Sequence, residues 1–311
     1  MVRNINFMVW GIYNLFDNGL LHSLISKNTF GEEKEALLIG LSFAFCIIFA
    51  YLVGSVNFAL VVSRLFYHDD VRRHGSGNAG TTNVLRNYGK KAGIITFAGD
   101  GLKGVLCIIV TCLVFACPVG EFHRYFYFVT AVYFSAFFCI FGHVFPCYSK
   151  FRGGKGFATM ALSVVFLNPF IALILAAIFF PLVLMTKYVS LGSVVAALFY
   201  PVLLHTFDSM EFGAQVTSTY YGSSTLAALL IGALITWAHR GNIKRIMDHT
   251  ERKLGERSTP TPQPVEAVET EPDDDSDDTY TPTATHGTVS VKKKKHPVSE
   301  KKLKKRKRGN Q

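Results

Sequence analysis

The residues best suited to chemistry lie in three polar clusters, each beside a long apolar run. The first, residues 72–86, is rich in Gly, Ser, Thr and Asn and ends at Arg86. Closely spaced glycines let backbone N–H groups turn inward to bind an anion, and a following helix adds its positive dipole end. Arg86 could make a forked contact with a phosphate. No GK[ST] ends the cluster, so it is not a Walker A loop, and a flexible linker is the simpler alternative. Its candidate anion-binding residues are Gly75, Ser76, Gly77, Asn78, Gly80, Thr82 and Asn83.

The second cluster, residues 142–156, combines cations with glycines just before another apolar run. Cations and glycines at the start of a helix suit a bound phosphate. The alternative is that Lys and Arg only anchor the end of a membrane helix, which leaves the glycines unexplained. A lone histidine such as His143 is more often a buried structural residue than a catalyst. The candidate residues here are His143, Arg152, Gly153, Gly154, Lys155 and Gly156.

The third cluster, residues 237–245, is followed by Glu251. His239 and Asn242 are three positions apart, so a helix would place them on one face. The alternative is the basic end of a membrane helix. Lys103 and Ser190 are single polar positions near the starts of apolar runs, where ionisable groups are functional candidates, although Lys103 could simply extend to the interface.

Several kinds of site are absent from the sequence. The six cysteines show neither metal-ligand nor disulfide spacing, so we interpret them as packing residues and expect no metal and no cofactor. None of the ten histidines is followed by Asp five positions later, which argues against the HxxxxD chemistry of acyl-thioester acyltransferases. The net charge of +10 in so apolar a chain indicates membrane orientation rather than nucleic-acid binding.

The apolar runs predict an all-α polytopic membrane protein. Half of the 311 residues are hydrophobic, and residues 36–62 contain no charge at all. A helix needs about 20 apolar residues to cross a bilayer. Asn168-Pro169 interrupts the longest later run, so we expect a turn there between two short or tilted helices, with one kinked helix as the alternative. The seven predicted spans are about 37–66, 93–117, 124–146, 157–168, 170–186, 190–206 and 222–239.

The charges predict the orientation. Loops 67–92, 147–156 and 187–189 and the segment after the last span hold most of the Lys and Arg of residues 36–257, which places them and the C-terminus in the cytoplasm and the N-terminus outside. We expect a membrane domain at 36–257 after an N-terminal extension, residues 1–35, which can also lie in the interface. Residues 258–311 lack apolar periodicity, so we predict a disordered charged tail, with contact to anionic lipid headgroups as an alternative to simple solvation.

Together the clusters resemble the bacterial acyl-phosphate–glycerol-3-phosphate acyltransferase family, PlsY. The resemblance covers about residues 51–255 and is most specific in the order and spacing of GSGN…TN…R and GGKG. The matching strings are GSVNFALVVSRLF, RRHGSGNAGTTNVLRNYGKKAG with DGLKG, GHVFPCYSKFRGGKGFAT, KYVSLGS, HRGNIKRI and TERKLG.

The resemblance implies acyl transfer from an acyl phosphate to glycerol 3-phosphate, giving lysophosphatidic acid, in the inner membrane. It implies that Ser76, Arg86, Arg152, Lys155, Ser190, His239 and Asn242 form the catalytic set, with Glu251 orienting the basic cluster. Two positions depart from the family pattern, because Arg152 replaces a lysine and Asn57 replaces a proline. The competing classes are a transporter of an anionic solute and a structural membrane protein whose polar clusters are only loops.

Overall fold

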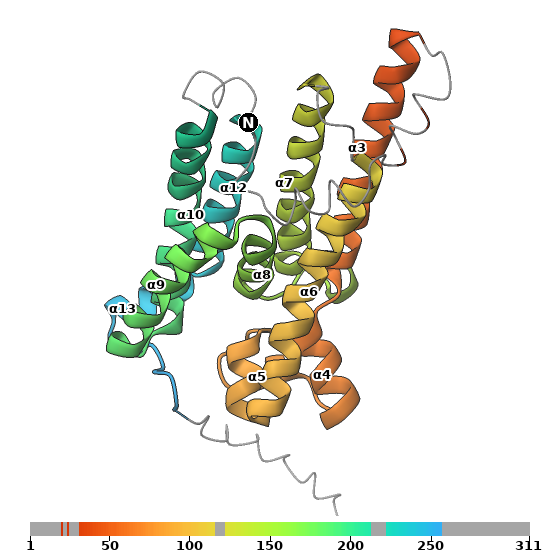
Figure 1. Cartoon of the computed structure of the whole chain (residues 1–311). Helices are drawn as coiled ribbons and strands as arrows, with labels where there is room; N and C mark the ends of the chain where they lie inside the picture. Colours follow the sequence, from red (N-terminus) through yellow and green to blue (C-terminus); the bar gives the residue numbers. More distant parts are fainter. Residues whose placement is uncertain (1–19, 21–23, 25–30, 116–121, 213–221, 257–311) are drawn as a thin grey trace, which may run out of the picture. The chain divides into compact units, whose positions relative to one another are not determined.

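A computed structural model describes Leu20, Leu24 and residues 31–115, 122–212 and 222–256, which form helices joined by short loops (Figure 1). Most of the predicted N-terminal extension and the whole predicted tail lie outside the described residues. The helices are α3 (Glu32–Ser55), α4 (Phe58–Tyr67), α5 (Thr81–Tyr88), α6 (Lys90–Phe115), α7 (Phe122–Val144), α8 (Phe157–Leu167), α9 (Pro169–Thr186), α10 (Val189–Phe212), α12 (Gly222–Ala238) and α13 (Arg240–Met247), with 3-10 turns at Val71–Arg73 and Cys147–Ser149.

The helix lengths confirm a chain built to cross a membrane several times. Five described segments are long and apolar enough, and α12 with α13, which meet at a 53° bend, makes a sixth. The predicted span 157–168 corresponds to α8, a short helix as expected: its 11 residues rise about 16 Å, roughly half of the hydrocarbon thickness. The predicted break is confirmed, since α8 ends at Leu167 and Pro169 opens α9, where its missing N–H costs nothing.

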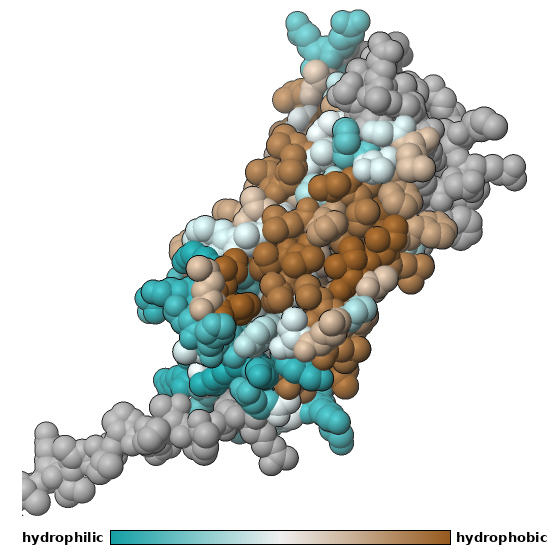
Figure 2. All heavy atoms as spheres, turned by 90° about the vertical axis from the view of Figure 1, so that its left-hand side faces the viewer, coloured by the Kyte–Doolittle hydropathy of each residue, from teal (hydrophilic) through white to brown (hydrophobic). Residues whose placement is uncertain are grey.

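The outer surface of these helices is apolar. A broad hydrophobic band covers the face shown in Figure 2, with hydrophilic residues gathered below it. Such a band would be a liability in water and is what the hydrocarbon core of a bilayer requires. Large exposed side chains contribute to the apolar surface on several helices, among them Leu37, Leu41 and Ile48 on α3, Leu173, Phe180 and Leu184 on α9, and Leu198 and Val202 on α10.

Small residues bring the helices into close contact. A Cβ atom on Gly54 of α3 would lie 2.2 Å from the carbonyl oxygen of Cys139 on α7, and one on Gly142 of α7 would lie 2.4 Å from Tyr51 O. Helices in lipid associate through such close backbone approach, because burial of apolar surface gives little driving force there. This packing fixes the C-terminal ends of α3 and α7, and the second polar cluster begins at the end of α7.

The first long apolar run is not one helix. It breaks between α3 and α4, where Asn57 accepts a hydrogen bond from Leu60 N at 3.0 Å and donates to Ala79 O at 3.1 Å. Lys103 Nζ donates to the freed carbonyl oxygens of Gly54 (2.9 Å) and Val56 (2.7 Å). Unsatisfied backbone groups are costly away from water, so a buried cation at this break has a structural reason.

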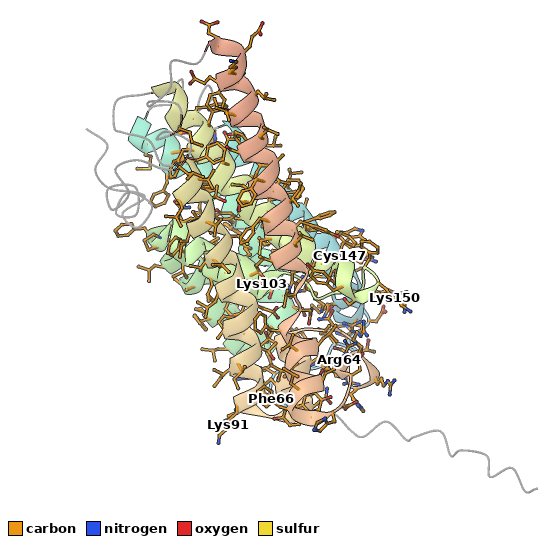
Figure 3. All side chains as sticks on the ribbon, turned by 90° about the vertical axis from the view of Figure 1, so that its right-hand side faces the viewer. Arg64, Phe66, Lys91, Lys103, Cys147 and Lys150 are labelled. Atoms are coloured by element: carbon orange, nitrogen blue, oxygen red, sulfur yellow. The ribbon has the colours of Figure 1, made fainter. Side chains whose placement is uncertain are left out.

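Lys103 completes a buried polar network under the break. Its Nζ lies 3.0 Å from Asp100 Oδ1 and 2.9 Å from His143 Nδ1, and its side chain is only 3 % exposed. Figure 3 places it among the helices, whereas Arg64, Lys91 and Lys150 lie at the periphery. Lys103 therefore does not extend to the interface.

Candidate functional site

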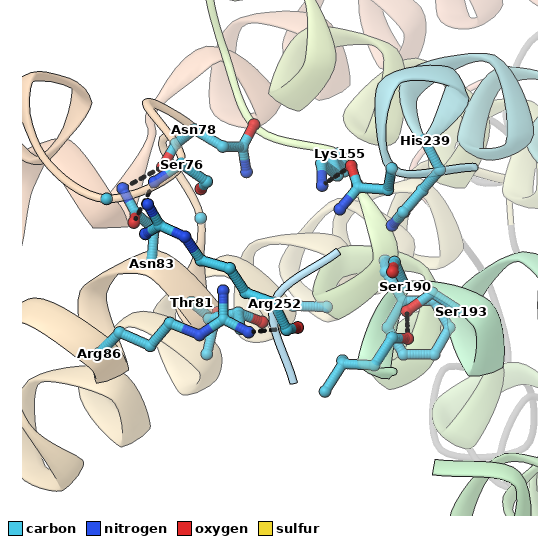
Figure 4. Close-up of a pocket in the computed structure, with 18 of the residues that line it drawn as sticks. Ser76, Asn78, Thr81, Asn83, Arg86, Lys155, Ser190, Ser193, His239 and Arg252 are labelled. Atoms are coloured by element: carbon cyan, nitrogen blue, oxygen red, sulfur yellow. Dashed lines mark hydrogen bonds between the residues drawn. The ribbon is translucent and has the colours of Figure 1, made fainter. Parts of the chain in front are cut away.

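The three polar clusters meet around one cavity of about 430 Å³ (Figure 4). They come from the loop before α5, the loop before α8, and the segment around α13, with the start of α10 adding a fourth side. The predicted residues that line the cavity are Gly75, Ser76, Asn78, Gly80, Thr82, Asn83, Arg86, His143, Lys155, Gly156, Ser190, His239, Asn242 and Glu251.

The glycine-rich loop is organised by one buried side chain. Asn83 Nδ2 donates to the carbonyl oxygens of Val71, His74 and Asn78, at 2.9, 3.0 and 3.1 Å, and its Oδ1 accepts from Ser76 N at 3.1 Å. The loop includes two glycines with left-handed backbone, Gly75 (φ 62°) and Gly77 (φ 70°). The hydrogen bonds of Asn83 thus fix the shape of the loop. Of the predicted residues in this loop, Gly77 does not line the cavity.

The loop before α8 delivers Lys155 to the cavity. Gly153 and Gly154 make its path possible, since a Cβ atom would lie 2.0 Å from His143 O at the first and 2.1 Å from His143 Nε2 at the second. Gly154 N also donates to His143 O at 3.1 Å. The two glycines therefore serve packing and do not line the cavity.

Lys155 is a partly buried cation of the cavity wall. Its Nζ donates to Asn242 Oδ1, and burial lowers its pKa to about 8. The adjacent helix α8 begins after Gly156 without a side-chain cap, so its N-terminal N–H groups are available to an anion. A buried cation beside uncapped helix amides is a suitable place for a phosphate.

Glu251 holds the third cluster together. Its Oε1 accepts from Ser190 Oγ at 2.8 Å and from Asn242 Nδ2 at 2.6 Å, and its Oε2 accepts from Arg245 Nε at 2.7 Å. Burial would raise the pKa of this carboxyl, but the three hydrogen bonds outweigh burial and lower it. Glu251 is therefore a carboxylate that positions its neighbours.

One ring nitrogen of His239 is hydrogen-bonded to the backbone. Its Nδ1 lies 2.8 Å from Ile235 O, and because a carbonyl can only accept, Nδ1 carries the proton. In a neutral ring Nε2 then keeps its lone pair, and the residue lines the cavity.

Arg152 and Lys103 do not lie where the sequence analysis placed them. Arg152 is exposed and outside the cavity lining, and Lys103 is buried in the network beneath it. Neither position supports direct contact with substrate. Five further polar residues of the cavity wall were not predicted as site residues: Thr81, Asp100, Ser193, Arg245 and Arg252. All five lie within the strings that carry the family resemblance, but no spacing distinguished them from neighbouring polar residues.

Comparisons with known proteins agree with this geometry. The profile of the family described as "Glycerol-3-phosphate acyltransferase" matches residues 44–249. A protein of that name from Clostridioides difficile (strain 630) is 36 % identical over 216 residues, which is 70 % of this chain and 97 % of that protein. Another, from Paraburkholderia xenovorans (strain LB400), is 38 % identical over 67 % of this chain and 89 % of its own length.

A solved structure is also similar. The crystal structure of PlsY (YgiH), described as an integral membrane glycerol 3-phosphate acyltransferase in its glycerol 3-phosphate form, is 32 % identical, with a TM-score of 0.56. The match covers 69 % of this chain and 96 % of that one. The chain is therefore a multi-pass membrane protein that belongs to the glycerol-3-phosphate acyltransferase family, PlsY.

Proposed function

We propose that this protein transfers an acyl group from an acyl phosphate to glycerol 3-phosphate and releases lysophosphatidic acid and inorganic phosphate. The observation that carries the proposal is a single cavity with cations on two opposite sides and an apolar wall. Arg86 and Lys155 lie on opposite sides of it in Figure 4, and Phe157 stacks on Phe179 in the wall at 5.2 Å. Two phosphates and one acyl chain match these three features.

The chemistry needs no protein nucleophile, because phosphate is already a good leaving group. The hydroxyl oxygen of glycerol 3-phosphate attacks the acyl carbonyl carbon, the bond from that carbon to the phosphate oxygen breaks, and the hydroxyl proton passes to an acceptor. The protein has to hold two anions in contact and offset their repulsion. We assign Lys155 and the N-terminus of α8 to the phosphate of the donor, whose acyl chain lies along Phe157 and Phe179.

The proton acceptor is a phosphate oxygen of a substrate in this proposal. Glu251 is a poor base because it accepts hydrogen bonds from three side chains. His239 Nε2 is the alternative acceptor. If His239→Gln keeps the wild-type pH–rate profile, the alternative is excluded; loss of one ionisation from the profile would favour it.

We also propose that the cavity and the C-terminus face the cytoplasm of a bacterial cell and that the N-terminus lies outside. The support is the positive-inside rule: Arg64, Lys91 and Lys150 lie towards one end of the bundle in Figure 3. Cysteines placed at these positions should resist a membrane-impermeant maleimide in intact cells. Labelling from outside would reverse the assignment.

The enzymatic proposal is tested with purified protein in detergent, labelled glycerol 3-phosphate and palmitoyl phosphate. Formation of labelled lysophosphatidic acid supports it, and palmitoyl-CoA in place of palmitoyl phosphate tests the choice of donor. No product from palmitoyl phosphate, combined with uptake of glycerol 3-phosphate into liposomes, would favour a transporter instead.

Glu251→Gln is expected to lower kcat/KM by about tenfold to a hundredfold in this assay. The amide cannot accept from Arg245 while also accepting from Ser190 and Asn242, so the third cluster loses its common partner. Steady-state kinetics measure the loss. The matched control is Glu256→Gln, an exposed carboxylate that accepts only a backbone hydrogen bond from Lys253. Equal kinetics for the two variants would remove the positioning role of Glu251.

Arg152→Ala tests whether Arg152 is catalytic, as the sequence predicts, or a surface residue, as its position outside the cavity indicates. Because Arg152 is exposed and does not line the cavity, the variant is expected to keep kcat/KM within about threefold of wild type, in line with a surface charge. The measurement is the same assay, at low ionic strength and again at high ionic strength. A large loss at both salt concentrations would restore Arg152 to the catalytic set.

A further inference from the structure

The segment after α13, residues 250–256, contributes Thr250, Glu251 and Arg252 to the cavity wall, and we call the segment the strap. Its backbone is held from two sides. Leu254 N donates to Lys187 O at 2.7 Å, and Arg86 Nη2 donates to the carbonyl oxygens of Arg252 (3.0 Å) and Lys253 (3.2 Å). The position of Arg252 in the cavity wall is therefore fixed by Arg86 on the glycine-rich side and by Lys187 at the end of α9.

The side chain of Arg252 is directed into the cavity. Figure 4 shows it extending from the strap towards Ser76 and Asn83 of the glycine-rich loop. Its Nη1 is inaccessible to solvent and has no hydrogen-bond partner. Arg86 Nε and Thr81 Oγ1 are also buried and without a hydrogen-bond partner, and both residues line the same cavity. Buried polar atoms are nearly always hydrogen-bonded in folded proteins, so three such atoms on one side of one cavity indicate a missing acceptor.

The charges on this side of the cavity also require an anion. Within the described part of the chain, no carboxylate forms an ion pair with Arg86 or Arg252. The nearest candidate, Glu251, already accepts from three other side chains. Burial lowers the pKa of Arg86; the negative charge of Glu251 opposes this shift, and the positive charge of Arg252 adds to it. Two guanidinium groups in the wall of one cavity, neither with a carboxylate at ion-pair distance in the described part of the chain, form a site for a dianion.

We propose that Arg252 and Arg86 together bind the phosphate of glycerol 3-phosphate, with Thr81 as a further donor. This assignment rests on the proposed function. The acceptor is favoured over the acyl phosphate because the stacked phenylalanines belong to the other side of the cavity: Phe157 follows Lys155 by two residues. An acyl chain along them leaves the Arg86–Arg252 side for the smaller, hydrophilic substrate.

Arg252→Gln tests the assignment by separating the two Michaelis constants. Loss of a charged, forked contact is expected to raise the KM for glycerol 3-phosphate by about tenfold to a hundredfold. The kcat and the KM for palmitoyl phosphate should stay within a few-fold of wild type. Arg252→Lys keeps the charge without the fork and should give an intermediate KM. The matched control is Lys253→Gln, which removes an exposed charge from the neighbouring position of the strap and should leave all three constants unchanged.

Each alternative outcome has a distinct signature. A wild-type KM for glycerol 3-phosphate in Arg252→Gln overturns the proposal. A raised KM for palmitoyl phosphate alone assigns the guanidinium pair to the donor and also overturns it. Equal losses of kcat and of both Michaelis constants in Arg252→Gln and Arg252→Lys indicate a merely structural strap. If the wild-type protein itself forms no lysophosphatidic acid, the proposed function has failed, whatever Arg252 does.

Discussion

Lys155→Ala is expected to lower kcat/KM for acyl transfer by about a hundredfold to a thousandfold, which is the usual loss when one buried electrostatic group is removed from an active site. The ammonium group lies beside the uncapped start of α8 and is held by Asn242. Alanine leaves the phosphate with helix amides alone and no compensating charge. The measurement is steady-state kinetics in detergent, with thermal unfolding to verify that the variant is folded.

The control for Lys155 lies in the same loop. Lys150 is exposed and has a left-handed backbone (φ 56°), which asparagine also tolerates, so Lys150→Asn removes a charge without strain. It should retain wild-type kinetics. Because the pKa of Lys155 is lowered to about 8, its charge is complete below that pH and is lost above it, so wild-type kcat/KM should fall on the alkaline side. Lys155→Arg should move that fall to higher pH; an unchanged profile would contradict a charge-based role.

Arg86→Ala is expected to lower kcat/KM by a hundredfold or more, with changes in both kcat and the KM for glycerol 3-phosphate. The loss exceeds that of Arg252→Gln because Arg86 both faces the cavity and holds the strap through two carbonyl oxygens. Displacement of a cavity wall by about 1 Å can itself cost a hundredfold. The assay is again formation of labelled lysophosphatidic acid.

Arg73→Ala is the matched control for Arg86, since Arg73 is an exposed arginine of the same polar cluster and lies outside the cavity lining. Near-normal rates in Arg86→Ala, or equal losses in both variants, would contradict the assignment of Arg86 to a substrate phosphate.

Most of the helices could be predicted from local sequence patterns. Uninterrupted apolar length predicts the long helices, and Asn168-Pro169 predicts the break before α9, because both depend on neighbouring residues alone. The break between α3 and α4 was not predicted. Residues 36–62 contain no charge, and the partner that stabilises the break, Lys103, comes from another helix.

In the site, too, features that depend on contacts between distant residues could not be predicted. The clusters predicted which segments meet, but not the direction of each side chain. Arg152 and Lys155 are three residues apart in one loop, and only the path of Gly153 and Gly154 past His143 decides which cation is buried. Arg252 had no signal of its own, because its role depends on contacts with Arg86, 166 positions away.

The place of the strap in the chain has a consequence for biosynthesis. The cavity wall is completed by Glu251 and Arg252, which come after every membrane-crossing helix of the described chain. A polypeptide still being translated, or one that terminates before residue 250, already contains all of those helices but lacks these two wall residues. The wall of the cavity can therefore be completed only after all of those helices have been synthesised.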